Sequence, residues 1–336
     1  MKWLPDAYSA IGEEKFAFND IPATPGFRGR MAELHGLAEL FSIHKVIGVT
    51  GALGVGKSWL LSKFVKGFDT SNRITIWQTL HEDRYDLWRF AWKIALRGEK
   101  QQESLQLREL LRDQFLTGKV QTRDVVSVLS RCLLARDDLL LIIDNYAPGS
   151  SNQLIQFIEK ETLQIGAESR VVLIGRENRF LVKDVRHFTL RGLCPDDLHE
   201  FVEHFPDRSV NAQEEALLYE ITEGNPLIVK LIMCSAQATY MKEPFAELLR
   251  SAHRLPEIED LYFGILGQLT TAERITLLKL LIEPQGLGGS FQIVADRITN
   301  RRETLGNLVR KGMIEDADEA FAFSRIARDC FAMLVA

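Results

Sequence analysis

The stretch that most constrains the fold is residues 45–62, KVIGVTGALGVGKSWLLS. The mostly apolar run from Val46 to Val49 predicts a buried strand, and the residues from Trp59 onward predict a helix. Between them, residues 51–58 match the pattern G-x-x-x-x-G-K-[ST]. A strand, a glycine-rich loop and a helix start thus follow one another in the order that a phosphate-binding loop requires. The full eight-residue match disfavours the alternative, a glycine-rich turn that merely precedes a helix.

The residue types in this loop suit a phosphate group. The glycines allow a tight turn that points a row of backbone N–H groups inward, toward a concavity that binds anions. The loop ends at a helix N-terminus, whose exposed N–H groups and positive dipole end also favour anions. We therefore predict nucleotide contacts from Gly51, Gly54, Val55, Gly56, Lys57, Ser58 and Trp59.

Two side chains of the loop and one carboxylate further along the chain predict a nucleotide-bound Mg²⁺ ion. Lys57 is expected to reach the β- and γ-phosphates, and the Ser58 hydroxyl is expected to bind the metal. Asp144 follows the aliphatic run 139–143, which is typical of a strand buried on both faces. A carboxylate at such a strand end can hold Mg²⁺, usually through water. The predicted metal-binding residues are therefore Ser58 and Asp144.

Two further residues are predicted to act on the terminal phosphate. Asn145 stands where many ATP-hydrolysing proteins have a carboxylate that activates the attacking water. An amide can orient water but cannot accept its proton, and general-base help is worth ~10²–10⁴-fold, so we expect slow hydrolysis. A different carboxylate, such as Glu177, is the alternative. Arg176 follows an expected strand, and its guanidinium could sense the γ-phosphate; a solvated loop arginine beside Glu177 is the other interpretation. The predicted catalytic residues are Lys57, Asp144, Asn145 and Arg176.

The first part of the chain alternates expected strands with amphipathic helices. The expected strands are 46–49, 73–80, 139–143, 170–175 and 187–193. This alternation predicts a mostly parallel sheet with helices on both faces, and a ligand site at the carboxyl ends of the strands. The helix expected over 86–98 should bury Leu87, Phe90, Ala91 and Ile94. The helix expected over 31–41 should carry Met31, Leu34, Leu37, Leu40 and Phe41 on one face.

From Pro195 the strand patterns give way to helices, until two short strands at 312–316 and 320–324 predict a hairpin. The predicted fold class is α/β: a parallel-sheet P-loop NTPase domain, then a small all-α helical domain and a winged-helix domain. Hinges are expected near 190–195 and 244–258. The expected divisions are an N-terminal approach segment (1–26), the nucleotide-binding domain (27–193), the helical domain (194–255) and the winged helix (256–336).

Composition excludes some classes of protein. No apolar stretch approaches the ~20 residues of a membrane span, and the N-terminus lacks the plan of a signal peptide, so we expect a cytoplasmic protein that does not contact the membrane. The net charge of −5 disfavours a surface devoted to nucleic acid. A local basic face over 301–311 keeps DNA binding as an alternative, although the neighbouring acidic run 315–319 counts against it.

Six stretches stand out along the chain: FRGR at 27–30, the loop at 51–58, FDTSNRITIW at 68–77, LLLIID at 139–144, VVLIGR at 171–176 and GNPLIVKLI at 224–232. Taken in order and spacing, they resemble the NB-ARC type of STAND NTPases, which are signal-transducing ATPases of apoptosis, of plant and bacterial immunity, and of some transcription regulators. The resemblance covers residues 27–336. The ordered set is specific, whereas the pieces after the glycine loop are not specific one by one.

The resemblance implies that ATP or ADP is the nucleotide. It implies that Gly29 and Arg30 lie by the adenine, that Arg176 is the sensor arginine and that Pro226 closes over the base. Taken from the residues alone, the proline ring could pack on adenine or could simply begin a helix. Many members carry a winged-helix histidine that touches the ADP β-phosphate. Ser324 stands there in this sequence, so either the contact is weaker or the ADP lock is loosened.

The resemblance further implies a switch that is compact with ADP and opens and self-associates with ATP. No effector segment or repeat array is recognisable, so we expect either that the chain is a fragment of a longer protein or that a protein partner supplies those functions. The leading hypothesis is an ATP/ADP-controlled switch with slow hydrolysis. The alternatives are a DNA-binding regulator or origin-type AAA+ ATPase that uses the winged helix, and a nucleotide-stabilised scaffold without useful turnover.

Overall fold

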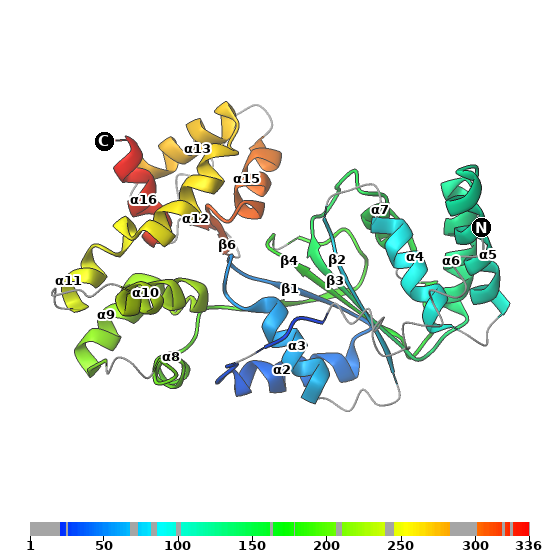
Figure 1. The fold of residues 1–336 in the computed structure, drawn as a ribbon, viewed down its shortest axis with the longest axis horizontal. Helices are drawn as coiled ribbons and strands as arrows, with labels where there is room; N and C mark the ends of the chain where they lie inside the picture. Colours follow the sequence, from blue (N-terminus) through cyan, green and yellow to red (C-terminus); the bar gives the residue numbers. More distant parts are fainter. Residues whose placement is uncertain are drawn as a thin grey trace.

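A computed structural model shows the arrangement of these segments. A five-stranded sheet lies at the centre of one body, and a mostly helical body adjoins it (Figure 1). Because the two bodies meet beside the glycine loop, a ligand bound to the loop would lie at their junction. The structure describes residues 21–24, 26–67, 73–81, 86–98, 102–161, 164–177, 179–205, 210–238, 245–282, 301–317, 320–322 and 325–335.

The sheet is parallel throughout, and its strand order is β2-β3-β4-β1-β5. Sequence neighbours β1 and β2 are separated by two inserted strands, which is possible because helical crossovers join the parallel strands. The interior strands β3 and β4 are apolar and buried on both faces, as the sequence predicted. The strands are β1 (Val46–Thr50), β2 (Ile74–Thr79), β3 (Leu139–Tyr146), β4 (Arg170–Gly175) and β5 (Val185–Thr189).

Helices cover both faces of the sheet, and each face has its own apolar core. Trp77 of β2 is buried against the first face, and Phe90 of α4 is buried on the second. The first face is covered by α2 (Met31–Ile43) and α3 (Lys57–Gly67). The second is covered by α4 (Asp86–Arg97), α5 (Gln102–Thr117), α6 (Thr122–Leu134) and α7 (Gln153–Glu161).

Helix α4 confirms the predicted inward face, because Leu87, Phe90, Ala91 and Ile94 are all buried. Helix α2 differs. Leu37 and Phe41 are buried, but Met31 in the first turn is 60% exposed. A helix that rests on one face of a sheet buries a narrow stripe rather than every apolar residue of its amphipathic face.

The second body begins after Leu193. Helix α8 starts with Pro195 followed by two acids, as expected of a helix N-terminus, and Asn211 with Glu214 forms a capping box at the start of α9. The helices are α8 (Pro195–Val202), α9 (Ala212–Thr222), α10 (Pro226–Ala238), α11 (Phe245–Arg250), α12 (Pro256–Gly267), α13 (Thr271–Ile282), α15 (Arg301–Arg310) and α16 (Arg325–Val335), with a 3₁₀ turn η2 at Ala252–Arg254.

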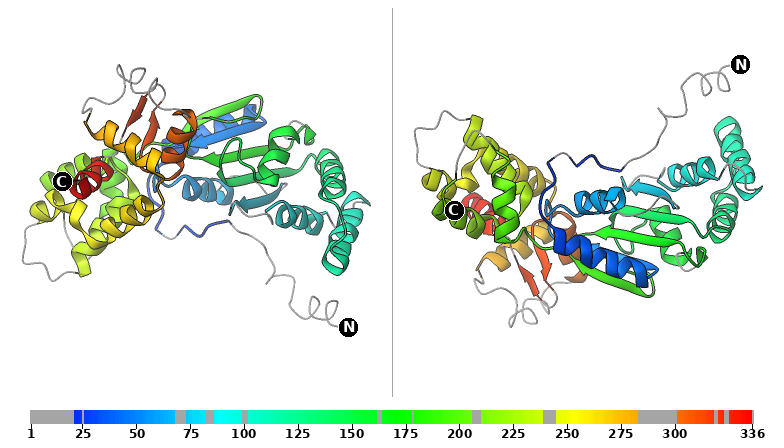
Figure 2. Two further views of the ribbon diagram at one scale, coloured as in Figure 1. Left: turned by 90° about the horizontal axis from the view of Figure 1, so that it is seen from above. Right: turned by 90° about the horizontal axis from the view of Figure 1, so that it is seen from below.

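Two short antiparallel strands, β6 (Glu315–Ala317) and β7 (Ala320–Ala322), form the expected hairpin. Strand β6 begins later than predicted, and the predicted end of β7 lies outside the described residues. Helices and hairpin together supply the elements of a winged helix. The view from above places this body at one end of the molecule (Figure 2). The domain boundaries at residues 193 and 255 stay predictions.

The buried apolar residues after residue 192 belong to one continuous cluster. Val229 of α10, Ile258 of α12, Leu308 of α15 and Cys330 of α16 are fully buried in it. Because one core joins the expected helical and winged-helix parts, a rearrangement between them would expose a large apolar surface. Among the described residues, no helix is long and apolar enough to cross a membrane.

Candidate nucleotide-binding site

The glycine loop joins the end of β1 to the start of α3. Gly51, Gly54 and Gly56 have φ angles of 142°, 78° and 98°, in the left-handed region that disfavours any residue with a side chain. A Cβ atom on Gly54 would lie 2.5 Å from the Cβ of Leu227, and one on Gly51 would collide with the Leu190 carbonyl. The loop therefore needs these glycines both for its turn and for the close approach of its neighbours.

Lys57 is the first residue of α3, and its side chain folds back over the loop. Its ammonium group donates hydrogen bonds to the carbonyls of Gly51 at 2.7 Å and Ala52 at 2.8 Å. Both acceptors lie at the beginning of the loop, so the side chain spans it from end to start. The ammonium is thereby held at the mouth of the turn, where an incoming phosphate can replace the carbonyls as its partner.

Ser58 and Asp144 meet although 86 residues separate them in the sequence. The Ser58 hydroxyl donates to Oδ2 of Asp144 at 2.9 Å, and the Asn145 backbone N–H donates to Oδ1 at 2.9 Å. Burial raises the pKa of the Asp144 carboxyl, since only 8% of the residue is exposed, while these hydrogen bonds and the nearby Lys57 and Arg176 charges lower it.

This pair suits a hard divalent cation. A hydroxyl and a carboxylate oxygen are the ligand types that Mg²⁺ takes in proteins, usually alongside phosphate and water. A buried carboxylate with a raised pKa also carries an unfavourable desolvation energy that a bound cation would relieve. The donor set therefore fits the metal predicted for Ser58 and Asp144.

Asn145 occupies an unusual backbone position. Its φ is 62°, and the pairing of β3 with β4 is irregular between Asp144 and Tyr146. The resulting bulge breaks the alternation of the strand and leaves Asn145 exposed between two buried residues. Its side chain therefore borders the site rather than the core, as expected of a residue that contacts the reacting phosphate.

A cavity of about 830 Å³ lies over the loop, large enough for a nucleotide. Its lining contains most of the residues that the sequence predicted, although they come from five separate parts of the chain. The structure brings together Arg30, Gly54, Val55, Gly56, Lys57, Ser58, Trp59, Asp144, Asn145, Arg176 and Pro226.

Two of the predicted residues that the structure describes, Gly51 and Gly29, are not in this lining. Gly51 is outside the lining of this cavity, because it sits at the loop's start. Gly29, with φ 63°, packs against Asp197, which a Cβ atom would strike, so its position is explained by close packing with α8. Ser324 lies outside the described residues.

Arg30 lines the cavity but uses its guanidinium to join chain segments. The residue is 3% exposed, and its guanidinium donates to the carbonyls of Val55 at 3.0 Å and Arg191 at 2.8 Å. Its backbone N–H donates to Asp197 of α8 at 3.1 Å. Arg30 thereby fastens the glycine loop to the segment that leads out of the sheet, and the contact with adenine stays a prediction.

Several lining residues were not predicted from the sequence. Phe201 and Phe205 flank the cavity with their rings 5.7 Å apart, edge to face. Their i, i+4 spacing within HEFVEHF was a detectable signal for an aromatic wall. Leu227 and Lys230 of α10 also line the cavity, one and four residues after Pro226.

Arg310, at the end of α15, also lines the cavity, and no local pattern pointed to it. Its Nε lies 2.9 Å from Oε1 of Glu177, and its Nη2 donates to Asn307 at 2.6 Å. Arg176, in turn, donates to the backbone carbonyl of Arg310. The residues that follow β4 are thus bound to the last helix turn of α15, 134 positions away in the sequence.

The parallel sheet has the order β2-β3-β4-β1-β5, its glycine loop runs into α3, and the Asp144 carboxylate at a strand end accepts a hydrogen bond from the loop serine. Together these features define the α/β fold found in P-loop ATPases. A Walker-type ATPase of Pyrococcus abyssi has this fold: it matches 91% of this chain and 96% of its own, with a TM-score of 0.58 and 14% identity.

Two further solved structures are similar over most of this chain. A STAND protein with a tetratricopeptide repeat sensor from Pyrococcus horikoshii matches 95% of the chain at 19% identity and a TM-score of 0.48, and the chain spans 44% of that protein. Cdc6p from Pyrobaculum aerophilum matches 96% of this chain and 98% of its own at 14% identity, with a TM-score of 0.43. No protein-family model and no curated protein matches the sequence.

Proposed function

We propose that this chain is a nucleotide-controlled switch of the STAND, NB-ARC type, which binds Mg-ATP, hydrolyses it slowly and is held in a different arrangement by ADP. One observation carries the proposal. The nucleotide cavity is lined by the glycine loop of the sheet domain, by Pro226 of α10 and by Arg310 of α15. A nucleotide there contacts both bodies, so its phosphates can favour one arrangement of them over another.

The contacts between the two bodies support this proposal. Their apolar cores are separate, whereas polar contacts join the bodies around the cavity. Asn225 donates to the Leu53 carbonyl at 2.8 Å, and Arg310 pairs with Glu177. A polar junction can open at a lower cost than an apolar core can. We therefore place the main hinge near 190–195, and we propose that residues 194–336 move largely as one unit.

The residues divide the chemistry as follows. The loop N–H groups and Lys57 bind the phosphates, while Ser58 and Asp144 hold Mg²⁺, which neutralises phosphate charge when it is bound. Arg176 senses the terminal phosphate after leaving its contact with the Arg310 carbonyl. Asn145 orients water without accepting its proton, so turnover is slow.

The rest of the proposal rests on the resemblance to the family. Pro226, at the first turn of α10, closes over the base, and the divisions 27–193, 194–255 and 256–336 are the functional parts. The ATP form self-associates, and a separate protein supplies the signal or the output. Loss of the family's histidine contact at Ser324 leaves the ADP form less firmly held.

The DNA-binding alternative relies on the basic side chains over 301–311. Arg310 is paired with Glu177, and Lys311 lies 2.7 Å from the buried carboxylate of Glu273 and also donates to the Gln268 carbonyl. Charges already paired within the protein gain little from phosphate, so these two of the four basic residues lend the DNA alternative little support. Binding to a duplex at low salt that weakens steeply as salt rises would instead favour the DNA alternative.

The proposal is tested by loading the chain with Mg-ADP or with a non-hydrolysable Mg-ATP analogue and measuring mass and radius by size-exclusion chromatography with light scattering and by small-angle X-ray scattering. The switch predicts a larger radius or mass with the analogue. Lys57→Ala is the control, and it should give the same profile with both nucleotides. Identical profiles for the wild-type chain would favour the scaffold alternative.

A further inference from the structure

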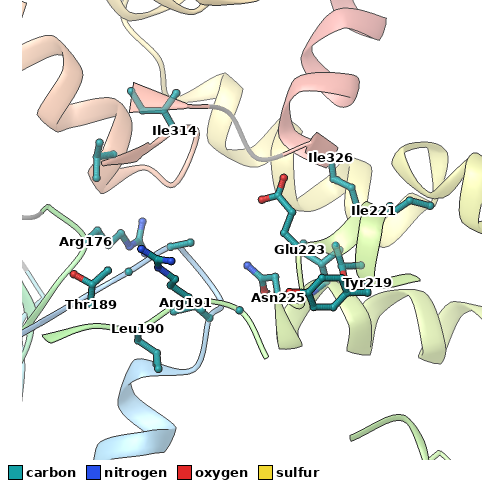
Figure 3. Close-up of a pocket in the computed structure, with 17 residues that line it drawn as sticks. Arg176, Thr189, Leu190, Arg191, Tyr219, Ile221, Glu223, Asn225, Ile314 and Ile326 are labelled. Atoms are coloured by element: carbon teal, nitrogen blue, oxygen red, sulfur yellow. Dashed lines mark hydrogen bonds between the residues drawn. The ribbon is translucent and has the colours of Figure 1, made fainter. Parts of the chain in front are cut away.

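A second cavity, of about 330 Å³, adjoins the first and is not explained by nucleotide binding (Figure 3). It borders the glycine loop at Gly51 and Ala52, two residues that do not line the nucleotide cavity. The end of β5, the turn between α9 and α10, and apolar residues of the carboxyl-terminal part close it on the other sides. The second cavity therefore lies where the sheet domain meets both parts of the helical body.

One wall of the second cavity is cationic. Arg176 and Arg191 come from different strand ends, and Figure 3 shows their side chains pointing toward one another. Among the described residues the Arg191 guanidinium has no hydrogen-bond or ion-pair partner; only its backbone carbonyl is engaged, by Arg30. Two guanidinium groups that share a cavity repel each other, and an anion between them removes that repulsion while accepting charge-assisted hydrogen bonds.

Much of the remaining lining is apolar. Ile221, Ile314 and Ile326 are buried and line the cavity, and Tyr219 also lines it. The one carboxylate in the lining, Glu223, lies between the two arginines and Ile326 in Figure 3. The second cavity thus combines two guanidinium groups with several apolar side chains, which is the combination that an amphiphilic anion requires.

We propose that the second cavity binds a small organic anion. Its carboxylate or phosphate group lies between Arg176 and Arg191, and its apolar body lies against Ile314, Ile326 and Tyr219. A volume of about 330 Å³ is near the lower end of the range for ligand sites, and it suits a compact ligand such as one ring with a charged group.

Binding in the second cavity is coupled to the state of the chain. Arg176 lines both cavities, so an anion in the second one competes with the terminal phosphate of the nucleotide for the same guanidinium. The ligand also touches the sheet domain and the helical body at once, and it stabilises their present arrangement by its own binding free energy. It therefore acts as an effector that favours the arrangement seen here.

Phenyl phosphate is a suitable probe, because it combines one ring with a dianion. The titration is done by calorimetry on chain saturated with ADP, so that the nucleotide cavity is filled. Phenyl phosphate should bind, and inorganic phosphate and benzyl alcohol should each bind at least about tenfold more weakly, since each lacks half of the required chemistry. The observed heat should be absent when buffer replaces protein.

The variant Arg191→Gln should weaken phenyl phosphate by about tenfold or more, because a charge-assisted hydrogen bond is lost, while ADP affinity stays unchanged. Arg186→Gln is the matched control: Arg186 is exposed on β5, the strand that precedes Arg191, and lies outside the cavity, so its loss should change neither affinity. No binding of phenyl phosphate, or equal binding by wild type and Arg191→Gln, overturns the proposal.

A repeat of the titration with Lys57→Ala, without nucleotide, separates this proposal from the proposed function. If Lys57→Ala binds phenyl phosphate, and adding Arg191→Gln lowers that affinity, the anion site in the second cavity is supported. This holds even if the wild-type chain fails to bind ADP. Conversely, ADP binding with no effect of Arg191→Gln on phenyl phosphate leaves the switch intact and refutes the anion site.

Discussion

Replacing Asp144 by asparagine should stabilise the nucleotide-free protein at neutral pH while impairing its use of Mg²⁺. The carboxylate is 8% exposed, and its burial raises its pKa. Both of its hydrogen bonds can survive the substitution. The amide oxygen keeps the Asn145 N–H, and the amide N–H₂ can donate to the Ser58 hydroxyl, which accepts as readily as it donates. The substitution therefore removes little besides the buried charge.

The sign and size of this change in stability follow from the linkage between folding and proton binding. A carboxyl whose pKa is raised by folding binds more protons in the folded state, so its ionised form costs stability above the folded pKa. Loss of the attraction to Lys57 and Arg176 offsets part of the gain. We expect the free energy of unfolding to increase by about 1 kcal/mol, which is typical of a substitution that removes a destabilising functional group. For a body of this size, that gain raises the melting temperature by roughly 2–4 °C.

The measurement is a thermal unfolding series of wild type and Asp144→Asn between pH 4 and pH 8, without nucleotide or metal. The difference should be largest at pH 7–8 and should shrink as the pH falls through the range where Asp144 of the wild type takes up its proton. In the same preparations, Asp144→Asn should make nucleotide affinity less dependent on Mg²⁺.

Asp138→Asn provides the matched control. Asp138 lies just before the other end of β3, and its hydrogen bonds to Arg136 lower its pKa, so its charge stabilises the fold and its loss should lower the melting temperature at neutral pH. A lower melting temperature for Asp144→Asn at pH 7, or a difference that does not change with pH, would refute the reasoning about the buried charge.

Four further outcomes are expected. Lys57→Ala should abolish ATP and ADP binding, and micromolar affinity in equilibrium dialysis would contradict the loop's role. Asn145→Asp should raise the single-turnover rate of ATP hydrolysis by ~10²-fold or more; an unchanged rate would mean that this amide is not limiting. Arg310→Gln and Glu177→Gln should show a coupling energy of about 1 kcal/mol in a double-mutant cycle of urea unfolding, and a value near zero would make their contact incidental. Gly54→Ala should destabilise the loop by ~1–3 kcal/mol, because φ is 78° and α10 leaves no room for a methyl group; undiminished stability would refute the packing argument.

Much of the sheet domain was predictable, because its signals are local. Strand Arg170–Gly175 has the predicted bounds, since a continuous apolar run with turn residues on both sides admits few other structures. The inward face of α4 likewise follows from helical periodicity. The exposure of Met31, which the sequence puts on the apolar face of α2, shows that periodicity gives the apolar face of a helix but not how much of that face its neighbours cover.

Only those residues of the candidate site that belong to recognisable motifs could be predicted from the sequence. The glycine loop, Ser58 and Asp144 could be paired from sequence, because a loop and a strand end at the same edge of a parallel sheet have to meet. Arg310 could not be found in this way. It reaches the site only because α15 packs beside the segment after β4, and no spacing between residues 176 and 310 encodes that contact.

The sequence by itself determined that a parallel sheet carries a phosphate loop, that Lys57, Ser58 and Asp144 gather there, and that a helical body follows. These follow from short-range patterns, in which backbone geometry leaves little choice. Only the tertiary structure decided that one continuous core unites that helical body, that Arg176 is bound to α15, and that a second cavity lies behind the loop. Such features arise where folded parts of the chain pack against each other. The free energy of this packing depends on shapes and charges that no local sequence pattern contains.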